Sequence, residues 1–491
     1  MKTRMGAAIA GAVAAILLAV LGGCAVLPTI NPDMAWSATP VRVESGRGPL
    51  SAEQSKAVLE KLKSRHGGAG IFDRHLALEE AIVGSPLIAG NRTVLLQDGP
   101  RTYEAMLTAI RGARHHVNFE TYIFEADEAG EKFADALIER RRKGVQVNLM
   151  VDSVGSIKTP REFFQKLRDA GVQTVEFNPV NPLRAKAGWD VNQRDHRKLV
   201  VVDGRSAFVG GINVSSVYSG SALGGRFGSG SSSSGGSGSG GSSGSGGDTT
   251  RDASGKKKPA DGLPWRDTQL LIEGPAVAEL QKLFVESWEK QKGPPLDKTT
   301  FFPRLAKRGD EVVRAIGSTP DDRYSLIYAT LISAIHNAEK EVFLTNAYFV
   351  PDPQLLDAMK QAAARGVDVR LLLPSKTDSE LVFHAGRAYY SEVLAAGIRV
   401  WERRDAMLHS KTALIDGVWS TVGSTNLDWR SFLHNEELNA VVLGEEFGNQ
   451  MRAMFEIDLK GSQEITLDAW QQRPLGMRLK ETFARIWQYW L

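Results

Sequence analysis

The chain carries the same order of predicted helices and strands twice. Each copy begins with a helical segment containing an Ala-Ile pair, continues through a β-rich run and a second helix, and closes with an apolar strand. The first copy runs from Met106 to Asp152 and the second from Leu331 to Pro374. Because helices alternate with short apolar strands in both copies, the repeat predicts an α/β protein with two similar halves, each a mainly parallel sheet flanked by helices.

The expected domain boundaries follow from this repeat. We place the first half at residues 91–300 and the second at 301–491, each about 200 residues long, which is a usual domain size. Residues 24–90 form an N-terminal lead-in. Residues 219–262 interrupt the first half with a segment rich in glycine and serine, and this composition predicts a disordered insertion. No Gly-Lys-Ser or Gly-Lys-Thr closes that segment, so it does not match a phosphate-binding loop.

Each half also carries one copy of a polar motif with identical spacing. A histidine is followed by a lysine two positions later, an aspartate seven positions later and an asparagine seventeen positions later. The motif residues are His196, Lys198, Asp203 and Asn213 in the first half and His409, Lys411, Asp416 and Asn426 in the second. A single His-x-Lys has no meaning, but four matching positions in two copies predict one site, built by both halves at their interface.

The residue types of this motif suit the transfer of a phosphodiester. Its negative charge repels nucleophiles, so catalysis needs cations and hydrogen-bond donors around the phosphorus. Residues two apart on a strand point to the same face, which puts each histidine beside its lysine. One imidazole can attack phosphorus while the other protonates the leaving oxygen, since the pKa of histidine is about 6.5. The two lysines and the two asparagines would hold the phosphoryl oxygens.

Four carboxylates complete the candidate site. Asp203 and Asp416 belong to the motif and are counted with the catalytic residues, although each ends a strand just before a glycine. That position favours a supporting role, through an Asx-type bond in the turn. A nucleophilic histidine also needs a partner on its other ring nitrogen, and Asp267 and Glu437 are the candidates. Ordinary surface carboxylates are the alternative for these two.

No metal ion or other cofactor is expected at this site. Lysine is not a usual metal ligand, and no cysteine or compact histidine cluster accompanies the motifs.

The beginning of the chain predicts export and a lipid anchor. Lys2 and Arg4 precede an apolar run that ends in Gly-Gly followed by Cys24, which is the single cysteine. A charged start, an apolar stretch and small residues are the layout of a secretory signal. A cysteine directly after them resembles a bacterial lipobox, which implies a signal peptide at residues 1–23 and acylation of Cys24. An ordinary signal peptide and an uncleaved anchor helix are the alternatives, although the run is short for a transmembrane helix.

The doubled motif resembles the phospholipase D superfamily, and the chain is similar to bacterial cardiolipin synthases within it. Further segments carry this similarity: Glu120-Thr121-Tyr122-Ile123-Phe124, Trp265-Arg266-Asp267, Ile272-Glu273-Gly274-Pro275, Asn346-Ala347-Tyr348-Phe349-Val350-Pro351 and Asp428-Trp429-Arg430-Ser431. The similarity covers the chain from about residue 90 to its end. The lipobox and the glycine/serine insertion depart from the common pattern.

This resemblance implies two phospholipase D-like halves and a ping-pong reaction without metal or nucleotide. His196 would form a phosphatidyl-histidine intermediate and His409 would act as acid and then as base, or the two roles are reversed. In a synthase the acceptor is the glycerol of a second phosphatidylglycerol, and the products are cardiolipin and glycerol. In a hydrolytic phospholipase D, the acceptor is water and phosphatidic acid is released.

Two other functions fit the sequence less well. A nuclease is disfavoured by the net charge of only +3 and by the predicted anchor, so no nucleic-acid partner is expected. A non-catalytic lipid-binding envelope protein would have no use for two intact motifs. The expected partners are therefore a phospholipid substrate and a membrane surface, with the chain lipid-anchored and facing the periplasm at the outer or inner membrane. Nothing in the sequence indicates an oligomeric state.

Overall fold

The computed structural model of the protein describes residue 27 and residues 40–66, 70–181, 189–222, 263–322 and 324–490. The predicted signal peptide, Cys24 and most of the glycine/serine insertion lie outside these residues. Within the described part, no helix is long and apolar enough to cross a membrane.

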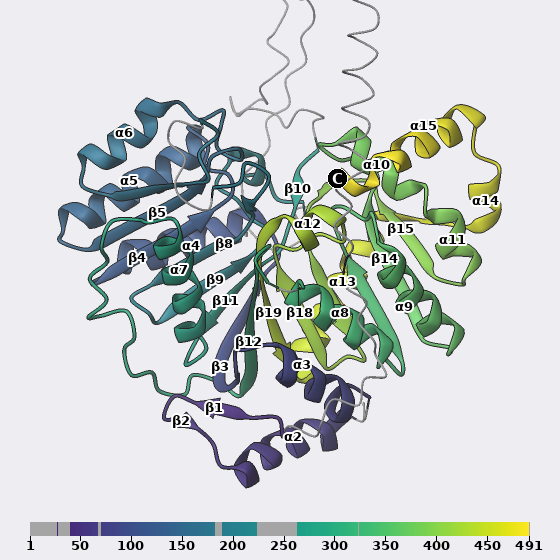
Figure 1. The fold of residues 1–491 in the computed structure, drawn as a ribbon, viewed down its shortest axis with the longest axis horizontal. Coiled ribbons are helices and arrows are strands. Elements are labelled where there is room, and N and C mark those ends of the chain that lie inside the picture. Colours follow the sequence, from purple (N-terminus) through teal and green to yellow (C-terminus); the bar gives the residue numbers. More distant parts are fainter. Residues whose placement is uncertain are drawn as a thin grey trace, which may run out of the picture.

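The first half alternates strands and helices in the order that the repeat predicts (Figure 1). Its strands are β3 (Leu87–Leu96), β4 (His116–Thr121), β5 (Gln146–Asp152), β6 (Gln173–Phe177), β7 (Arg194–Asp195), β8 (Lys198–Val202), β9 (Ser206–Gly210), β10 (Trp265–Arg266) and β11 (Gln269–Glu273). Its helices are α4 (Gly99–Gly112), α5 (Glu128–Arg142), α6 (Arg161–Asp169), the short η3 (Ser216–Tyr218) and α7 (Val277–Lys290).

The second half repeats this order. Its strands are β12 (Glu311–Ser318), β13 (Glu341–Thr345), β14 (Asp368–Pro374), β15 (Arg399–Arg403), β16 (Met407–Leu408), β17 (Thr412–Ile415), β18 (Trp419–Gly423) and β19 (Asn435–Leu443). Its helices are α8 (Leu326–His336), α9 (Pro353–Ala364), α10 (Glu380–Arg387), α11 (Tyr390–Ala395), α12 (Trp429–Leu433) and α13 (Glu445–Lys460). The chain then adds β20 (Ser462–Ile465), α14 (Leu467–Gln471), α15 (Leu475–Ile486) and η4 (Gln488–Trp490).

The N-terminal lead-in packs on the second half and adds strands beside β3 of the first half. It comprises β1 (Val43–Ser45), β2 (Gly48–Pro49), α2 (Ala52–His66), the π-helical η1 (Gly70–His75) and α3 (Leu76–Ile82). Strand β1 pairs in parallel with the start of β3, and buried side chains of η1 and α3 belong to the same apolar cluster as those of α8 and α9.

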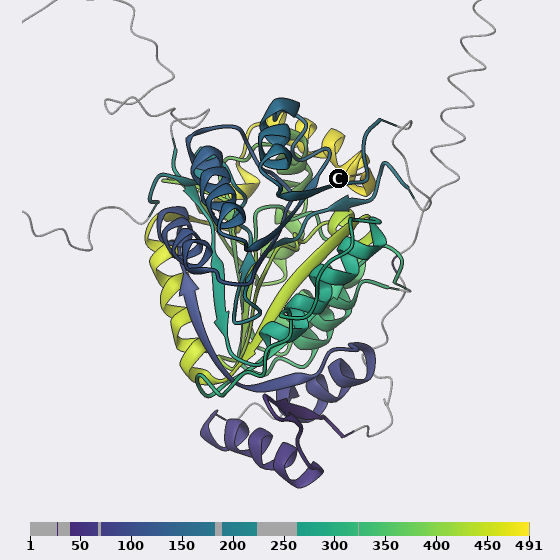
Figure 2. The same cartoon turned by 90° about the vertical axis from the view of Figure 1, so that its left-hand side faces the viewer.

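The two halves join through paired strands and a shared core. Strand β3 pairs antiparallel with β11 of its own half and with β12 of the other half, so one sheet runs through the molecule. One apolar cluster contains Leu199 of β8 and Leu414 of β17 together with side chains of α7 and α13. Figure 2 shows these two helices, teal and yellow-green, on opposite flanks of the sheets. The α/β class with two similar halves is therefore confirmed.

The expectation of a mainly parallel sheet is wrong. Among pairs of described strands that belong to the same half, only β4–β5 and β5–β6 in the first half and β13–β14 and β14–β15 in the second are parallel. The motif strands β8 and β17 instead turn back as hairpins onto β9 and β18. The two turn residues, Asp203-Gly204 and Asp416-Gly417, have φ angles of 53° and 60°, and of 51° and 70°. Positive φ at both central residues of a β-turn is the geometry of a type I′ turn, for which Asp-Gly is a favoured pair.

Asp203 and Asp416 support these turns and lie away from the histidines, which corrects their placement among the catalytic residues. The Asp203 carboxylate accepts backbone N–H bonds from residues 114–116 at 2.8–2.9 Å. Asp416 accepts the equivalent bonds from residues 339–341 at 2.8–3.2 Å. Each aspartate therefore ties the start of a neighbouring strand to the hairpin turn. Five residues of strand, about 16 Å, separate Asp203 from Lys198.

We predict that Asp203→Ala and Asp416→Ala each lower the free energy of unfolding by about 1–3 kcal/mol, because buried N–H groups lose their acceptor. Urea unfolding would measure this loss. Asp357→Ala is the control, since Asp357 makes only a 3.6 Å surface ion pair with Lys360. Turnover per folded molecule should stay close to that of the unaltered chain. A large loss of turnover in variants of unchanged stability would return the two aspartates to the catalytic set.

Candidate active site

Each motif histidine is bound by its backbone to the opposite half. Strand β7 pairs in parallel with the start of β19, and the next residue, His196, donates its backbone N–H to Glu436 O at 2.9 Å. Strand β16 pairs in the same way with β10, and His409 donates its N–H to Arg266 O at 2.8 Å. These two short ladders hold both motifs at the interface between the halves.

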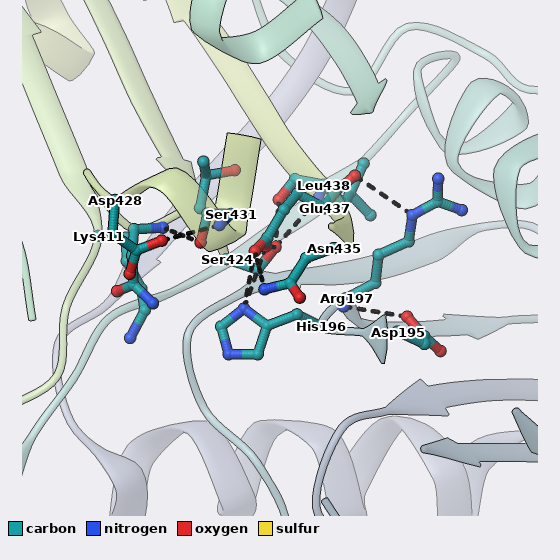
Figure 3. Close-up of polar contacts among 12 residues, drawn as sticks. Asp195, His196, Arg197, Lys411, Ser424, Asp428, Ser431, Asn435, Glu437 and Leu438 are labelled. Atoms are coloured by element: carbon teal, nitrogen blue, oxygen red, sulfur yellow. Dashed lines mark hydrogen bonds and ion pairs between the residues drawn. The ribbon is translucent and has the colours of Figure 1, made fainter. Parts of the chain in front are cut away.

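Each imidazole is also paired with a carboxylate of the opposite half. His196 Nδ1 lies 3.0 Å and 3.1 Å from the two oxygens of Glu437 (Figure 3). His409 Nδ1 lies 2.7 Å from Asp267 Oδ2. Both carboxylate side chains are completely buried. An ionised carboxylate accepts the Nδ1–H proton, which leaves the Nε2 lone pair free for chemistry. The structure thus places both carboxylates named from the sequence beside the histidines.

The small residues of each motif leave room for these carboxylates. A Cβ atom on Gly211 would lie 2.3 Å from Asp267 Oδ1, so no side chain fits there. The equivalent position in the second half is Ser424, whose hydroxyl donates to Glu437 Oε2 at 2.5 Å. A small residue is therefore needed at this position of each motif, because the carboxylate that pairs with the histidine of the other motif lies against it.

Lys198 and Lys411 are buried beside their own histidines. The Nζ of each donates to the carbonyl oxygen of the histidine two residues earlier, at 2.5 Å. Burial lowers the pKa of Lys198 to about 7; the charge of Glu437 opposes this shift and that of Lys411 adds to it. Burial likewise lowers the pKa of Lys411 to about 8. Since the charge of Lys411 acts on Lys198, the two lysines belong to one site, and a bound anion would stabilise the charge of both.

The electrostatic surroundings keep His196 neutral and its partner ionised. Burial lowers the pKa of His196 to about 4; Glu437 opposes this, and the charges of Lys198 and Lys411 add to it. Burial favours protonated Glu437, but the charges and hydrogen bonds around it still hold its pKa down at about 2. At neutral pH the pair is therefore a neutral imidazole donating to a carboxylate.

His409 has a second acid in its surroundings. Burial and then Lys411 lower the pKa of His409, whereas Asp267 and Asp378 both raise it. Asp378 follows β14 and also accepts a hydrogen bond from Tyr348. Asp267 and Asp378 thus oppose the lowering of the His409 pKa, and Glu437 opposes that of His196.

Aromatic side chains that were not assigned from the sequence line both histidines. The Tyr122 ring lies edge-on to His196 with centroids 5.1 Å apart, and the Lys198 ammonium lies 5.2 Å from its centroid. At the other histidine, the Trp265 ring lies 5.2 Å away and the Tyr218 hydroxyl lies 3.3 Å from His409 Nδ1. Tyr218 directly precedes the glycine/serine segment, and no local pattern marks it as part of the site.

The two motif asparagines differ in their bonding. Asn213 Oδ1 accepts the Ile123 N–H at 3.1 Å, and its amide nitrogen donates to Tyr218 at 3.4 Å. Asn426 Oδ1 is buried and has no hydrogen-bond partner among the described residues. A half-turn of that amide would present its NH2 group instead, and a phosphoryl oxygen could accept from it. Of the two, Asn426 is therefore the better placed for a ligand.

No group of three or more His, Cys, Asp or Glu side chains that could hold a metal ion occurs in the described ranges.

Comparison with known proteins identifies relatives of the chain. A family model described as "Cardiolipin synthase, PLD-like domain" matches residues 106–218 and 331–459, one match in each half. A cardiolipin synthase of Alkalihalophilus pseudofirmus is 34% identical over 430 residues, which cover 87% of this chain and 77% of that protein. A cardiolipin synthase of a Geobacillus species is 34% identical over 84% of this chain and 74% of its own length.

A solved structure shares the fold. The phosphatidylserine synthase of Haemophilus influenzae superimposes with a TM-score of 0.58 at 12% identity, and the match covers 83% of this chain and 96% of that one. At this identity the likeness concerns the fold alone.

We predict that Glu437→Gln and Asp267→Asn each lower kcat by roughly 10²–10⁴-fold with little change in KM, because an amide can donate to Nδ1 and so favours the wrong tautomer. Steady-state kinetics on a phosphodiester substrate would measure this effect. Glu464→Gln is the control, since Glu464 is half exposed and makes a surface ion pair with Arg399 at 3.1 Å. An unchanged kcat in either buried variant would mean that the carboxylates do not orient the histidines.

Proposed function

The chain belongs to the cardiolipin synthase family of phospholipase D-like proteins, and we propose that it joins two phosphatidylglycerol molecules into cardiolipin and releases glycerol. One observation carries this proposal: two histidine–carboxylate pairs, each formed across the interface between the halves, lie around two buried lysines. The residue roles given below belong to the same proposal.

In the first step, His196 Nε2 attacks the phosphorus of one phosphatidylglycerol. The bond from phosphorus to the glycerol oxygen breaks, and His409, in its imidazolium form, protonates that oxygen. Free glycerol leaves, and a phosphatidyl group remains on His196. The neutral state of His196 beside ionised Glu437 suits the nucleophile. Burial lowers the pKa of His409 as well, so the imidazolium that acts as acid would depend on the negative charge of the bound phosphodiester in addition to Asp267 and Asp378.

In the second step, His409 is neutral and accepts a proton from a headgroup hydroxyl of a second phosphatidylglycerol. The hydroxyl oxygen attacks phosphorus, the bond from phosphorus to His196 breaks, and cardiolipin is complete. Lys198, Lys411 and Asn426 would bind the non-bridging oxygens in both steps. The hydrogen bonds from buried lysines are strongest to the oxygens that carry the most negative charge. These contacts would therefore stabilise the transition state more than the bound substrate.

Hydrolysis by a phospholipase D is the second candidate, because the same residues serve when water replaces the second headgroup. The family relationship favours the synthase, since relatives that match along most of their length are cardiolipin synthases.

We predict that the full-length protein converts phosphatidylglycerol in vesicles to cardiolipin and glycerol with a metal chelator present. His196→Ala and His409→Ala should each lower the rate by about 10³-fold or more, because the nucleophile or the proton carrier is lost. Mass spectrometry of the lipids would measure the products. His115→Ala is the control, since His115 is exposed and lies beside the distant turn at Asp203.

The same incubations separate the alternatives. Phosphatidic acid as the only product would make the protein a hydrolytic phospholipase D, and cleavage of plasmid DNA without lipid turnover would make it a nuclease. In a brief reaction of the His409→Ala protein, stopped in alkaline denaturant, a phosphatidyl group should map to the peptide that contains His196. In the His196→Ala protein, the proposed roles predict no phosphatidyl group on His409. A phosphatidyl group found on His409 of the unaltered chain would mean that the two histidines have the opposite roles.

We further propose that Cys24 is acylated and holds the protein on a membrane of the bacterial envelope, facing the periplasm. This proposal rests on the sequence, because Cys24 lies outside the described residues. A labelled fatty acid should be incorporated into the unaltered chain and should be absent from Cys24→Ser. Equal labelling of both chains would contradict the assignment.

A further inference from the structure

Helix α15 exposes a stripe of large apolar side chains. Leu475, Leu479, Phe483 and Ile486 are exposed to between 61% and 74%, and Trp487 directly after the helix is exposed to 45%. Side chains three or four residues apart lie on the same face of a helix, so these residues form one continuous stripe. Such a stripe on a folded surface marks a place where another surface docks.

The opposite face of α15 is fixed to the rest of the protein. Glu481 is 2% exposed and forms ion pairs with Arg473 at 2.9 Å and with Arg387 of α10 at 3.8 Å. Ala484 is buried on the same side. A buried carboxylate held by two arginines sets the rotation of the helix, because turning it would expose a charge pair and bury the stripe. The outward direction of the stripe is therefore imposed by the fold.

Basic side chains flank the stripe on both sides. At about 100° per residue, Lys480 projects along one edge of the stripe, and Arg478 and Arg485 project along the other edge. The Arg485 guanidinium lies 4.7 Å from the Tyr389 ring, which holds it at that edge. An apolar face bordered by cations is the pattern of helices that lie in the interface of a membrane with anionic lipids.

The stripe lies at the end of the molecule where the histidines lie. Its helix packs on α10, which follows the loop that carries Asp378, and η4 packs on α12, which follows the motif residue Asn426. Exposed Ile157 and Val180 follow β5 and β6 at the same edge of the first half. Figure 1 shows α6 and α15 at one end of the molecule, on either side of α12 and β10.

We propose that this end of the protein docks on a bilayer of anionic phospholipid, with α15 lying in the interface. The inference rests on the proposed function for the substrate, which is itself a component of such a bilayer. A lipid surface fits better than a protein because the stripe is bordered by cations and lies at the end of the molecule where the histidines lie, and the proposed substrate is itself a membrane lipid. Docking in this orientation lets a headgroup reach the histidines while its acyl chains stay in the bilayer.

The test compares the double variant Leu479→Ser/Phe483→Ser with Phe302→Ser in the full-length protein. Phe302 is 46% exposed but lies beside the turn at Gly204, at the far end of β8 from the site. Turnover of long-chain phosphatidylglycerol in vesicles should fall about tenfold or more in the double variant, since two anchoring side chains are lost. Turnover of a short-chain phosphatidylglycerol dispersed as monomers should stay unchanged in both proteins. Equal vesicle turnover in the double variant and the control would overturn the proposal.

A second measurement does not depend on catalysis. In full-length protein with Cys24→Ser, Phe483→Cys provides a single thiol for a polarity-sensitive fluorophore. Its emission should shift to the blue on phosphatidylglycerol vesicles, and less on vesicles of phosphatidylcholine or at high salt. The absence of an emission shift on every vesicle would overturn the docking proposal. A change of oligomeric state in Leu479→Ser/Phe483→Ser would also overturn it, because the stripe would then be the contact surface for a second copy of the chain. If neither the unaltered chain nor its variants turn over the monomeric phosphatidylglycerol, the proposed function is wrong. The fluorescence measurement would still show whether α15 docks on the bilayer.

Discussion

The exchange of carboxylates between the two halves is the contact on which the rest of the structure depends. Glu437 of the second half holds His196 of the first, and Asp267 of the first holds His409 of the second. A buried carboxylate is costly unless it is paired, so the closed interface is favourable only when both histidines lie opposite their carboxylates. The ladders β7–β19 and β10–β16, the common core and the paired β3 and β12 all hold the halves in the one arrangement that satisfies both pairs.

The same burial that makes the pairs costly prepares the site for an anion. It lowers the pKa of His196, which keeps the ring unprotonated, and it lowers the pKa of both lysines. Without a ligand the site therefore holds less positive charge than its residues could carry. A phosphodiester would supply the missing partner and draw the lysines to their charged state, so that binding and charging of the site are coupled.

Much of this arrangement could be predicted from the sequence, because it is written in local spacing. The repeat predicted the two halves, and the doubled motif brought attention to the residues that the structure places together. The antiparallel hairpins do not follow from the apolar pattern, because buried parallel and antiparallel strands read alike in it; only the Asp-Gly pairs indicate the turns. Tyr218 could not be found, since its contact with His409 arises from tertiary packing. Spacing alone also carries no information on which carboxylate meets which histidine.

The crossed pairing has a consequence for how such a chain can evolve. After duplication of an ancestral half, the two copies could not drift apart independently, because a change beside one histidine alters the partner of the other. Gly211 and Ser424 illustrate this constraint, since each is limited in size by the carboxylate that serves the opposite half's histidine. Two inactive variants, one altered in the first half and one in the second, could regain activity together only if they exchanged whole halves between molecules. Genetic complementation between such alleles would therefore report on domain swapping.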